Sequence, residues 1–201
     1  MSVSGALFGA FCIFAVLDWI AVGQQVKPLE YFAKPAALAA LLVWAACGTP
    51  SPWLIAALFC SLVGDVLLML PVDAFVGGLL AFLLGHVAYV LAFHPPAVRS
   101  ALWMLVIVAV LSPIAVRIIG AVHERPLRGA VALYSLVISA MVAAAMCSGR
   151  PLAIAGALLF LASDMLIAWT RFVGAKAWGP VAIIVTYHVG QAALAAALRA
   201  G

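Results

Sequence analysis

Residues 52–70 read PWLIAALFCSLVGDVLLML, and Asp65 is the one charged side chain among them. A helix needs about 20 mostly apolar residues to cross the hydrocarbon core of a bilayer, and this run has nearly that length. Gly48-Thr49-Pro50-Ser51 precedes the run and Pro71-Val72-Asp73 follows it. Gly, Pro and polar residues of this kind end helices. Residues 52–70 are therefore expected to form a membrane-spanning helix.

The same pattern continues along the whole chain. Of its 201 residues 69% are apolar and 8% are charged, whereas soluble domains contain about 45–50% apolar and about 25% charged residues. Gly, Pro and charged residues divide the chain into eight apolar runs: 3–22, 32–47, 52–70, 73–93, 101–122, 129–146, 152–169 and 178–198. We therefore predict an all-α, polytopic membrane bundle of eight transmembrane helices, with residues 1–201 forming a single integral membrane domain.

The basic residues indicate a membrane topology. The ten Lys and Arg residues give a formal net charge of +4 and form no basic run, so a nucleic-acid site is not predicted. Most of them fall in or beside the odd-numbered connections, namely Lys27, Lys34, Arg117, Arg125, Arg128, Arg171 and Lys176. Because cytoplasmic loops carry an excess of Lys and Arg, we expect the odd connections in the cytoplasm and both termini outside. The expected location is a bacterial inner membrane.

The two halves of the chain resemble each other. Residues 61–69 read SLVGDVLLM and residues 160–168 read FLASDMLIA, with Asp65 and Asp164 at matching positions. His86 and His188 stand in the next run of each half. This pattern is compatible with two parallel four-helix repeats about an axis along the membrane normal, or with chance similarity in an apolar sequence. A repeat of this kind would bring the two aspartates to matching depths on facing helices.

Two carboxylates lie in the middle of apolar runs. A carboxylate at the centre of a membrane helix costs about 2.5–3.5 kcal/mol, so Asp65 and Asp164 are predicted to be functional residues. The structural alternative is an ion pair with Lys34 or Arg117. Asp18 lies near the end of its run, where its carboxylate can also reach the membrane interface.

Other polar side chains in the runs need partners within lipid, and a shared polar cavity would supply them. His86 and Tyr89 share one helix face, and Tyr187 and His188 lie one turn before Gln191. Lys34 opens the second run. Its side chain is expected either to bind a lipid phosphate or to anchor the helix at the membrane interface. No H-E-x-x-H or C-x-x-C spacing occurs, so no metal site is predicted.

Several motifs follow one another along the chain: YFAKP at 31–35, GDVLL at 64–68, GHVAY at 85–89, Tyr134, GALLFLASD at 156–164 and TYHVGQ at 186–191. In this order they resemble the motifs of the YhhN-like lysoplasmalogenase family of eight-helix membrane proteins, over nearly the whole chain. The resemblance implies hydrolysis of the vinyl ether bond of a lysoplasmalogen, a lysophospholipid, to a fatty aldehyde and glycerophospho-ethanolamine or -choline. It implies no cofactor.

The resemblance also implies roles for the polar residues. Asp65 and Asp164 are expected to be catalytic, one as the acid that protonates the vinyl ether carbon and the other as a carboxylate that stabilises the cation and activates water. The residues expected to bind substrate or line a polar cavity are Asp18, Lys34, His86, Tyr89, Tyr134, Ser163, Tyr187, His188 and Gln191. Two alternatives remain open: a small proton-coupled transporter and a lipid-binding membrane protein.

Overall fold

Helices make up most of the protein. The computed structural model describes residues 2–199, and each of its eight helices is long and apolar enough to cross a membrane. They are α1 (Val3–Gly23), α2 (Lys27–Ala46), α3 (Pro52–Met69), α4 (Phe75–Phe93), α5 (Ala97–Ala121), α6 (Arg125–Ser148), α7 (Pro151–Phe172) and α8 (Gly179–Leu198). The predicted eight-helix membrane bundle is confirmed, and the chain is a multi-pass integral membrane protein.

Proline sets the start of several helices. A proline occupies the first turn of five of the described helices, α2, α3, α6, α7 and α8. Proline suits that position because its fixed φ is helical and the N–H it lacks would have no intrahelical partner there. The same residues that divide the apolar runs in the sequence therefore also begin the next helix.

Four helices extend further than the apolar runs predicted. α2 begins at Lys27 rather than at Phe32, so Lys34 lies inside the helix and does not open it. α5 and α6 begin at 97 and 125 rather than at 101 and 129, and α7 ends at Phe172 rather than at Trp169. The charged side chains at these ends can stay helical because their long stems carry the charge to the interface.

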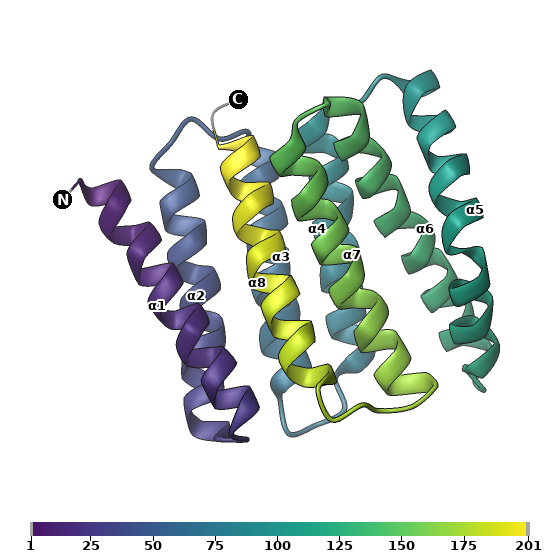
Figure 1. The fold of residues 1–201 in the computed structure, drawn as a ribbon, viewed down its shortest axis with the longest axis horizontal. Coiled ribbons are helices and arrows are strands. Elements are labelled where there is room, and N and C mark those ends of the chain that lie inside the picture. Colours follow the sequence, from purple (N-terminus) through teal and green to yellow (C-terminus); the bar gives the residue numbers. More distant parts are fainter. Residues whose placement is uncertain (1, 200–201) are drawn as a thin grey trace.

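Consecutive helices pack as antiparallel pairs, and both α3 and α8 join the first pair to the rest of the bundle. α1 packs on α2, α3 on α4, α5 on α6, and α7 on α8, while α8 also contacts α1 and α2 and α4 packs on α6. Figure 1 shows α1 at one edge of the bundle and α5 at the other, with both ends of the chain at the same end of the bundle. The two edge helices α1 and α5 therefore bury less of their surface than the helices between them.

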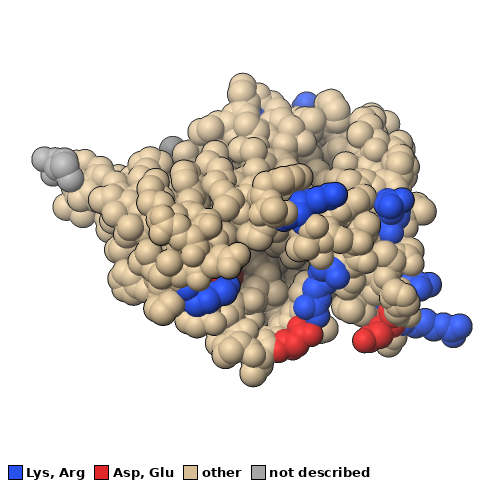
Figure 2. All heavy atoms as spheres, turned by 60° about the horizontal axis from the view of Figure 1, so that its bottom comes forward, with Lys and Arg blue, Asp and Glu red and all other residues tan. Residues whose placement is uncertain are grey.

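Charged side chains gather at the end of the bundle that carries the odd-numbered connections. Figure 2 shows blue and red side chains around a hollow at this end. One ion pair here joins the α3–α4 connection to the last turn of α7, since the Arg171 guanidinium lies 2.7 Å from Asp73 Oδ2. The guanidinium, with a backbone N–H bond from Phe75, lowers the pKa of Asp73. This distribution matches a helix bundle whose charges face the membrane surface.

The backbones of α7 and α8 approach each other closely. A Cβ added at Gly156 would lie 2.9 Å from the Gly190 carbonyl oxygen, and one added at Gly190 would lie 3.0 Å from the Gly156 oxygen. Small residues at such a crossing allow membrane helices to pack closely. The contact fixes the register of α7, which carries Asp164, against α8, which carries Tyr187.

Candidate active site

Asp164 lies in a cluster built by three helices. The Tyr134 hydroxyl on α6 donates a hydrogen bond to Asp164 Oδ2, and His86 Nε2 on α4 lies 3.0 Å from the same oxygen. His86 Nε2 also lies 2.9 Å from the Tyr134 oxygen. Because the Tyr134 proton is directed at the carboxylate, the imidazole supplies the second donor from Nε2. Both bonds use Oδ2, so Oδ1 is left for other chemistry.

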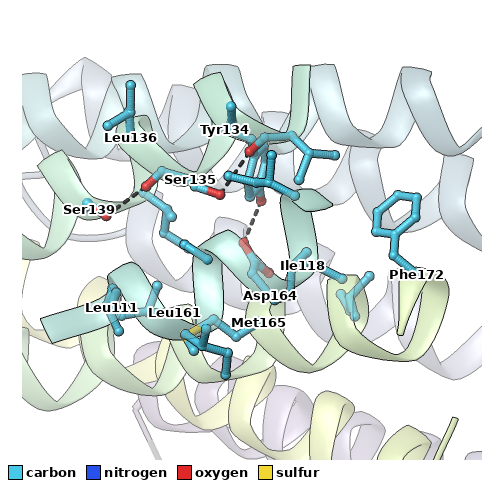
Figure 3. A pocket seen from close by; sticks show the side chains of 18 of the residues that line it. Leu111, Ile118, Tyr134, Ser135, Leu136, Ser139, Leu161, Asp164, Met165 and Phe172 are labelled. Atoms are coloured by element: carbon cyan, nitrogen blue, oxygen red, sulfur yellow. Dashed lines mark hydrogen bonds between the residues drawn. The ribbon is translucent and has the colours of Figure 1, made fainter. Parts of the chain in front are cut away.

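An apolar cavity of about 340 Å³ opens onto this cluster. Figure 3 shows Asp164 and Tyr134 pointing toward each other, with Leu111 and Leu161 to one side and Phe172 to the other. Its walls come from α3 to α7, and its other polar residues are Ser112, Ser135 and Ser139. The Asp164 carboxyl group thus borders an apolar cavity that can hold a hydrocarbon chain.

Asp65 lies in a second cluster with different partners. The Tyr187 hydroxyl on α8 donates to Asp65 Oδ2 at 2.7 Å, and Lys34 Nζ on α2 lies 3.5 Å from Oδ1. The Asp65 side chain is 2% exposed and that of Lys34 is 16% exposed. The ion pair considered as the structural alternative therefore exists for Asp65. Lys34 is engaged by this carboxylate rather than free at the membrane surface.

The buried ring of Phe160 lies between the two clusters and packs on a residue of each. Phe160 packs edge-to-face on His86 at 4.7 Å between ring centroids and on Tyr187 at 5.3 Å. α3 and α7 make no extended contact with each other. The aspartates thus do not lie on directly facing helices, as a repeat axis between α3 and α7 would require. Each faces an aromatic core that both clusters share.

The partners of the two aspartates follow a common scheme. Each aspartate is held by one side chain from the second helix of its own half and one from the fourth helix of the other half: Lys34 and Tyr187 for Asp65, and Tyr134 and His86 for Asp164. The Tyr89 hydroxyl donates to Gln191 Oε1 at 2.5 Å, and these residues stand three positions after the matching histidines. Side chains from both halves of the chain therefore hold each aspartate.

Asp18 and His188 form a third polar group between α1 and α8. Both side chains are fully buried, and His188 Nε2 lies 4.0 Å from Asp18 Oδ2. The Trp19 indole N–H donates to His188 Nδ1 at 3.1 Å, so a neutral His188 carries its proton on Nε2. Within residues 2–199 neither Asp18 oxygen accepts a hydrogen bond. The interpretation that Asp18 reaches the membrane interface is therefore wrong.

Ser163 has a different place from the one predicted for it. Its hydroxyl donates to the Ile183 carbonyl oxygen at 3.0 Å and so joins α7 to α8. It does not line the cavity beside Asp164. In the part of the chain that is described, no three His, Cys, Asp or Glu side chains come close enough to hold a metal ion.

Sequence reasoning assigned no role to two residues that shape these clusters. Phe160 lies in the motif at 156–164. Nothing in an apolar sequence distinguishes this phenylalanine as the ring that packs between two polar clusters. Trp19 carried a usable signal, because an indole N–H inside a membrane helix needs an acceptor. Its acceptor, His188, lies 169 positions away in the chain.

Comparison with known proteins assigns the chain to a family. The family model described as YhhN family matches residues 29–198. The human protein named "Lysoplasmalogenase TMEM86B" is 36% identical over 136 residues, which cover 67% of this chain and 58% of the human protein. The proteins of that name from Rattus norvegicus and Mus musculus are both 32% identical, over 79% and 90% of this chain and 67% and 79% of their own lengths.

The matched region therefore spans less than two thirds of the human relative. No solved structure matches the chain significantly. The family match covers all the helices except α1 and the start of α2, and it includes both aspartate clusters. On this match and on its similarity to the three mammalian proteins, the chain belongs to the YhhN family.

Proposed function

We propose that this protein is a membrane hydrolase that cleaves the vinyl ether bond of lysoplasmalogens to a fatty aldehyde and glycerophospho-ethanolamine or -choline. The observation that carries the proposal is the position of Asp164, a carboxyl group that contacts Tyr134 and His86 at the wall of an apolar cavity. The name of the mammalian relatives, lysoplasmalogenase, supports the same activity. The cavity would hold the alkenyl chain of the lipid.

Asp164 is the proposed general acid. Its Oδ1 carries the proton, since Oδ2 already accepts hydrogen bonds from Tyr134 and His86. The proton passes to the β-carbon of the vinyl ether while the ether oxygen stabilises the α-carbon as an oxocarbenium ion. The Asp164 carboxylate that remains is held by its two donors and lies beside the new positive charge.

Water completes the reaction at the same carboxylate. A water molecule adds to the oxocarbenium carbon and gives one proton to the Asp164 carboxylate. The product of this addition is a hemiacetal. The hemiacetal then loses its hydroxyl proton, its carbon–oxygen bond to glycerol breaks, and the glycerol oxygen takes up a proton. The sum is one water consumed for each vinyl ether cleaved, with no net proton change.

Asp65 has a supporting role in this proposal. It does not line the cavity, and both of its oxygens are engaged, by Lys34 and Tyr187. Its contribution is to hold α2, α3 and α8 together around Phe160, which packs on His86.

A proton-coupled carrier is the second candidate function. The observation that favours it is the fully buried Asp18 and His188 pair, which the hydrolytic mechanism does not use. Ionisable side chains of this kind form proton relays in transporters.

Turnover in detergent separates the two candidates. The purified protein is incubated with lysoplasmenyl-ethanolamine, and the saturated 1-alkyl ether serves as the matched control substrate. We expect aldehyde from the vinyl ether and none from the alkyl ether, because only the vinyl ether can be protonated on carbon. A folded protein that releases no aldehyde at any pH between 5 and 9 would contradict the proposal and favour the carrier, which needs a sealed vesicle.

A further inference from the structure

An arginine without a partner flanks the cavity beside Asp164. Arg117 stands one turn before the end of α5, and its guanidinium carbon lies 5.5 Å from the centroid of the Trp169 ring on α7. Its neighbours Val116 and Ile118 line the cavity, as does Ala168 beside Trp169. Within the described residues 2–199, Arg117 forms no ion pair or hydrogen bond with another residue, so its N–H donors are available.

Other cations near the two clusters are already occupied. Arg171 pairs with Asp73 at 2.7 Å and stacks on Phe75. Arg128 donates two hydrogen bonds to the Val122 carbonyl oxygen. Lys34 pairs with Asp65 in the other cluster. Arg117 is thus a free guanidinium at the side of the cavity that holds the proposed acid.

The distance along α7 matches the length of a lysophospholipid. Trp169 follows Asp164 by five residues, which is about 7.5 Å along a helix. Seven bonds separate the β-carbon of a lysoplasmalogen from its phosphorus, about 8 Å in an extended chain. A lipid with its vinyl ether at Asp164 therefore places its phosphate at the level of Trp169, where Arg117 lies.

We propose that Arg117, packed on Trp169, is the subsite for the phosphate of the lysophospholipid; this inference rests on the proposed function. A guanidinium can donate two parallel hydrogen bonds to a phosphate. The glycerol portion then runs along α7 toward Asp164, and the alkenyl chain continues to the side of the cavity where Leu111 and Leu161 lie (Figure 3). The phosphate contact thus adds affinity for the headgroup end of the lipid.

The test compares Arg117→Gln with Arg171→Gln, a matched control at the same end of the bundle whose guanidinium is occupied by Asp73. Each variant is assayed in mixed micelles with lysoplasmenyl-ethanolamine and with 1-alkenylglycerol, which has the vinyl ether but no phosphate. We expect Arg117→Gln to raise KM for the phospholipid roughly 10–100-fold with little change in kcat, as for loss of a charge-assisted contact. KM for alkenylglycerol is expected to stay unchanged.

Two further measurements, on an Arg117→Lys variant and on competition by inorganic phosphate, test the assignment of the phosphate subsite. Arg117→Lys keeps the charge without the planar donors and is expected to raise KM for the phospholipid by less than Arg117→Gln, which also covers the case that the glutamine variant folds poorly. Inorganic phosphate is expected not to compete, because the lipid is also held through its chain. Competition by inorganic phosphate that Arg117→Gln abolishes would assign a free-anion site and overturn the lipid assignment.

The failures of the two proposals differ. If the wild type cleaves both substrates and Arg117→Gln leaves KM for the phospholipid unchanged, the phosphate subsite is wrong and the hydrolase proposal stands. If the wild type cleaves neither substrate, the hydrolase proposal is wrong and the subsite falls with it. An equal rise of KM for both substrates would show a general loss of the cavity and would also overturn the subsite.

Discussion

Asp164 and Asp65 each accept a hydrogen bond from a tyrosine on another helix, Tyr134 and Tyr187 respectively. The next partner differs, since Asp164 faces His86 whereas Asp65 faces the ammonium group of Lys34. Asp164 also borders the cavity, and Asp65 does not. Two similar motifs therefore supply one carboxyl group that can meet substrate and one that is held in an ion pair. In a membrane interior the partner, more than the residue type, decides what an aspartate can do.

Asp164→Asn is expected to have the largest effect on turnover. Asparagine can still accept the bond from Tyr134 but cannot deliver a proton to carbon. Loss of a general acid typically lowers the rate about 10²–10⁴-fold, so kcat is expected to fall at least about 100-fold. Aldehyde release by purified variants measures this, with Asp65→Asn as the matched control that should lose far less. Equal losses of kcat in Asp164→Asn and Asp65→Asn would contradict the separate roles proposed for the two aspartates.

Asp65→Asn is expected to act mainly on stability, since it leaves Lys34 without its counter-charge. Removing one member of a buried ion pair is strongly destabilising. Lys34 is 16% exposed, so we expect a smaller loss of roughly 2 kcal/mol in the free energy of unfolding. Denaturant titration in detergent measures it.

The double variant Asp65→Asn/Lys34→Met sharpens this expectation. Removing both charges removes the cost of an unpaired cation, so the double variant should be more stable than Asp65→Asn alone. If instead the destabilisation by the two substitutions simply adds, the Lys34–Asp65 pair is not what holds this cluster together.

The fold was largely predictable because lipid imposes its length and polarity on the chain. Each of the eight described helices overlaps one predicted apolar run, since a membrane leaves the backbone few other ways to satisfy its hydrogen bonds. The helix ends were less predictable. Lys27 and Arg125 stand in helical turns but look like loop residues in the sequence.

The site was predictable in its residues but less so in its contacts. A carboxylate in an apolar run is costly, which singled out Asp65 and Asp164. Whether Lys34 pairs with Asp65 depends on the rotation and register of α2 against α3, and this packing leaves no local pattern. The burial of Asp18 against His188 depends likewise on how α1 meets α8.

The two tyrosines are expected to have unequal effects. Tyr134→Phe removes a donor from the proposed acid, and loss of a hydrogen bond to a charged group costs about 1.5–3 kcal/mol. We expect kcat to fall about tenfold or more, with little change in KM. Tyr187→Phe removes the corresponding donor from Asp65 and should lower the unfolding midpoint while kcat stays within about twofold. Steady-state kinetics and thermal unfolding of both variants, measured side by side, check this; equal losses of kcat would argue against separate roles.

Breaking the exposed ion pair between Asp73 and Arg171 is expected to have the smallest effect on stability. It serves as a comparison for the buried pair of Asp65 and Lys34. The Arg171 guanidinium lowers the pKa of Asp73 below its ordinary 3.8. Stability from this lowered pKa is present above about pH 4 and is lost as the pH falls through the folded-state value. Asp73→Asn should therefore lower the unfolding midpoint slightly at pH 7 and less at pH 3, with salt reducing the difference. A shift as large as that of Asp65→Asn would contradict the distinction between buried and surface pairs.

The most direct test of proton delivery to the vinyl ether carbon is the isotope content of the aldehyde formed in D₂O. The purified protein is incubated with lysoplasmenyl-ethanolamine in D₂O, and the aldehyde is trapped at once so that later exchange of its hydrogens does not contribute. The proposed chemistry predicts one deuterium on the carbon next to the aldehyde carbon, and loss of this product with Asp164→Asn. Enzymatic release of unlabelled aldehyde, or labelled aldehyde formed equally fast by Asp164→Asn, would contradict it.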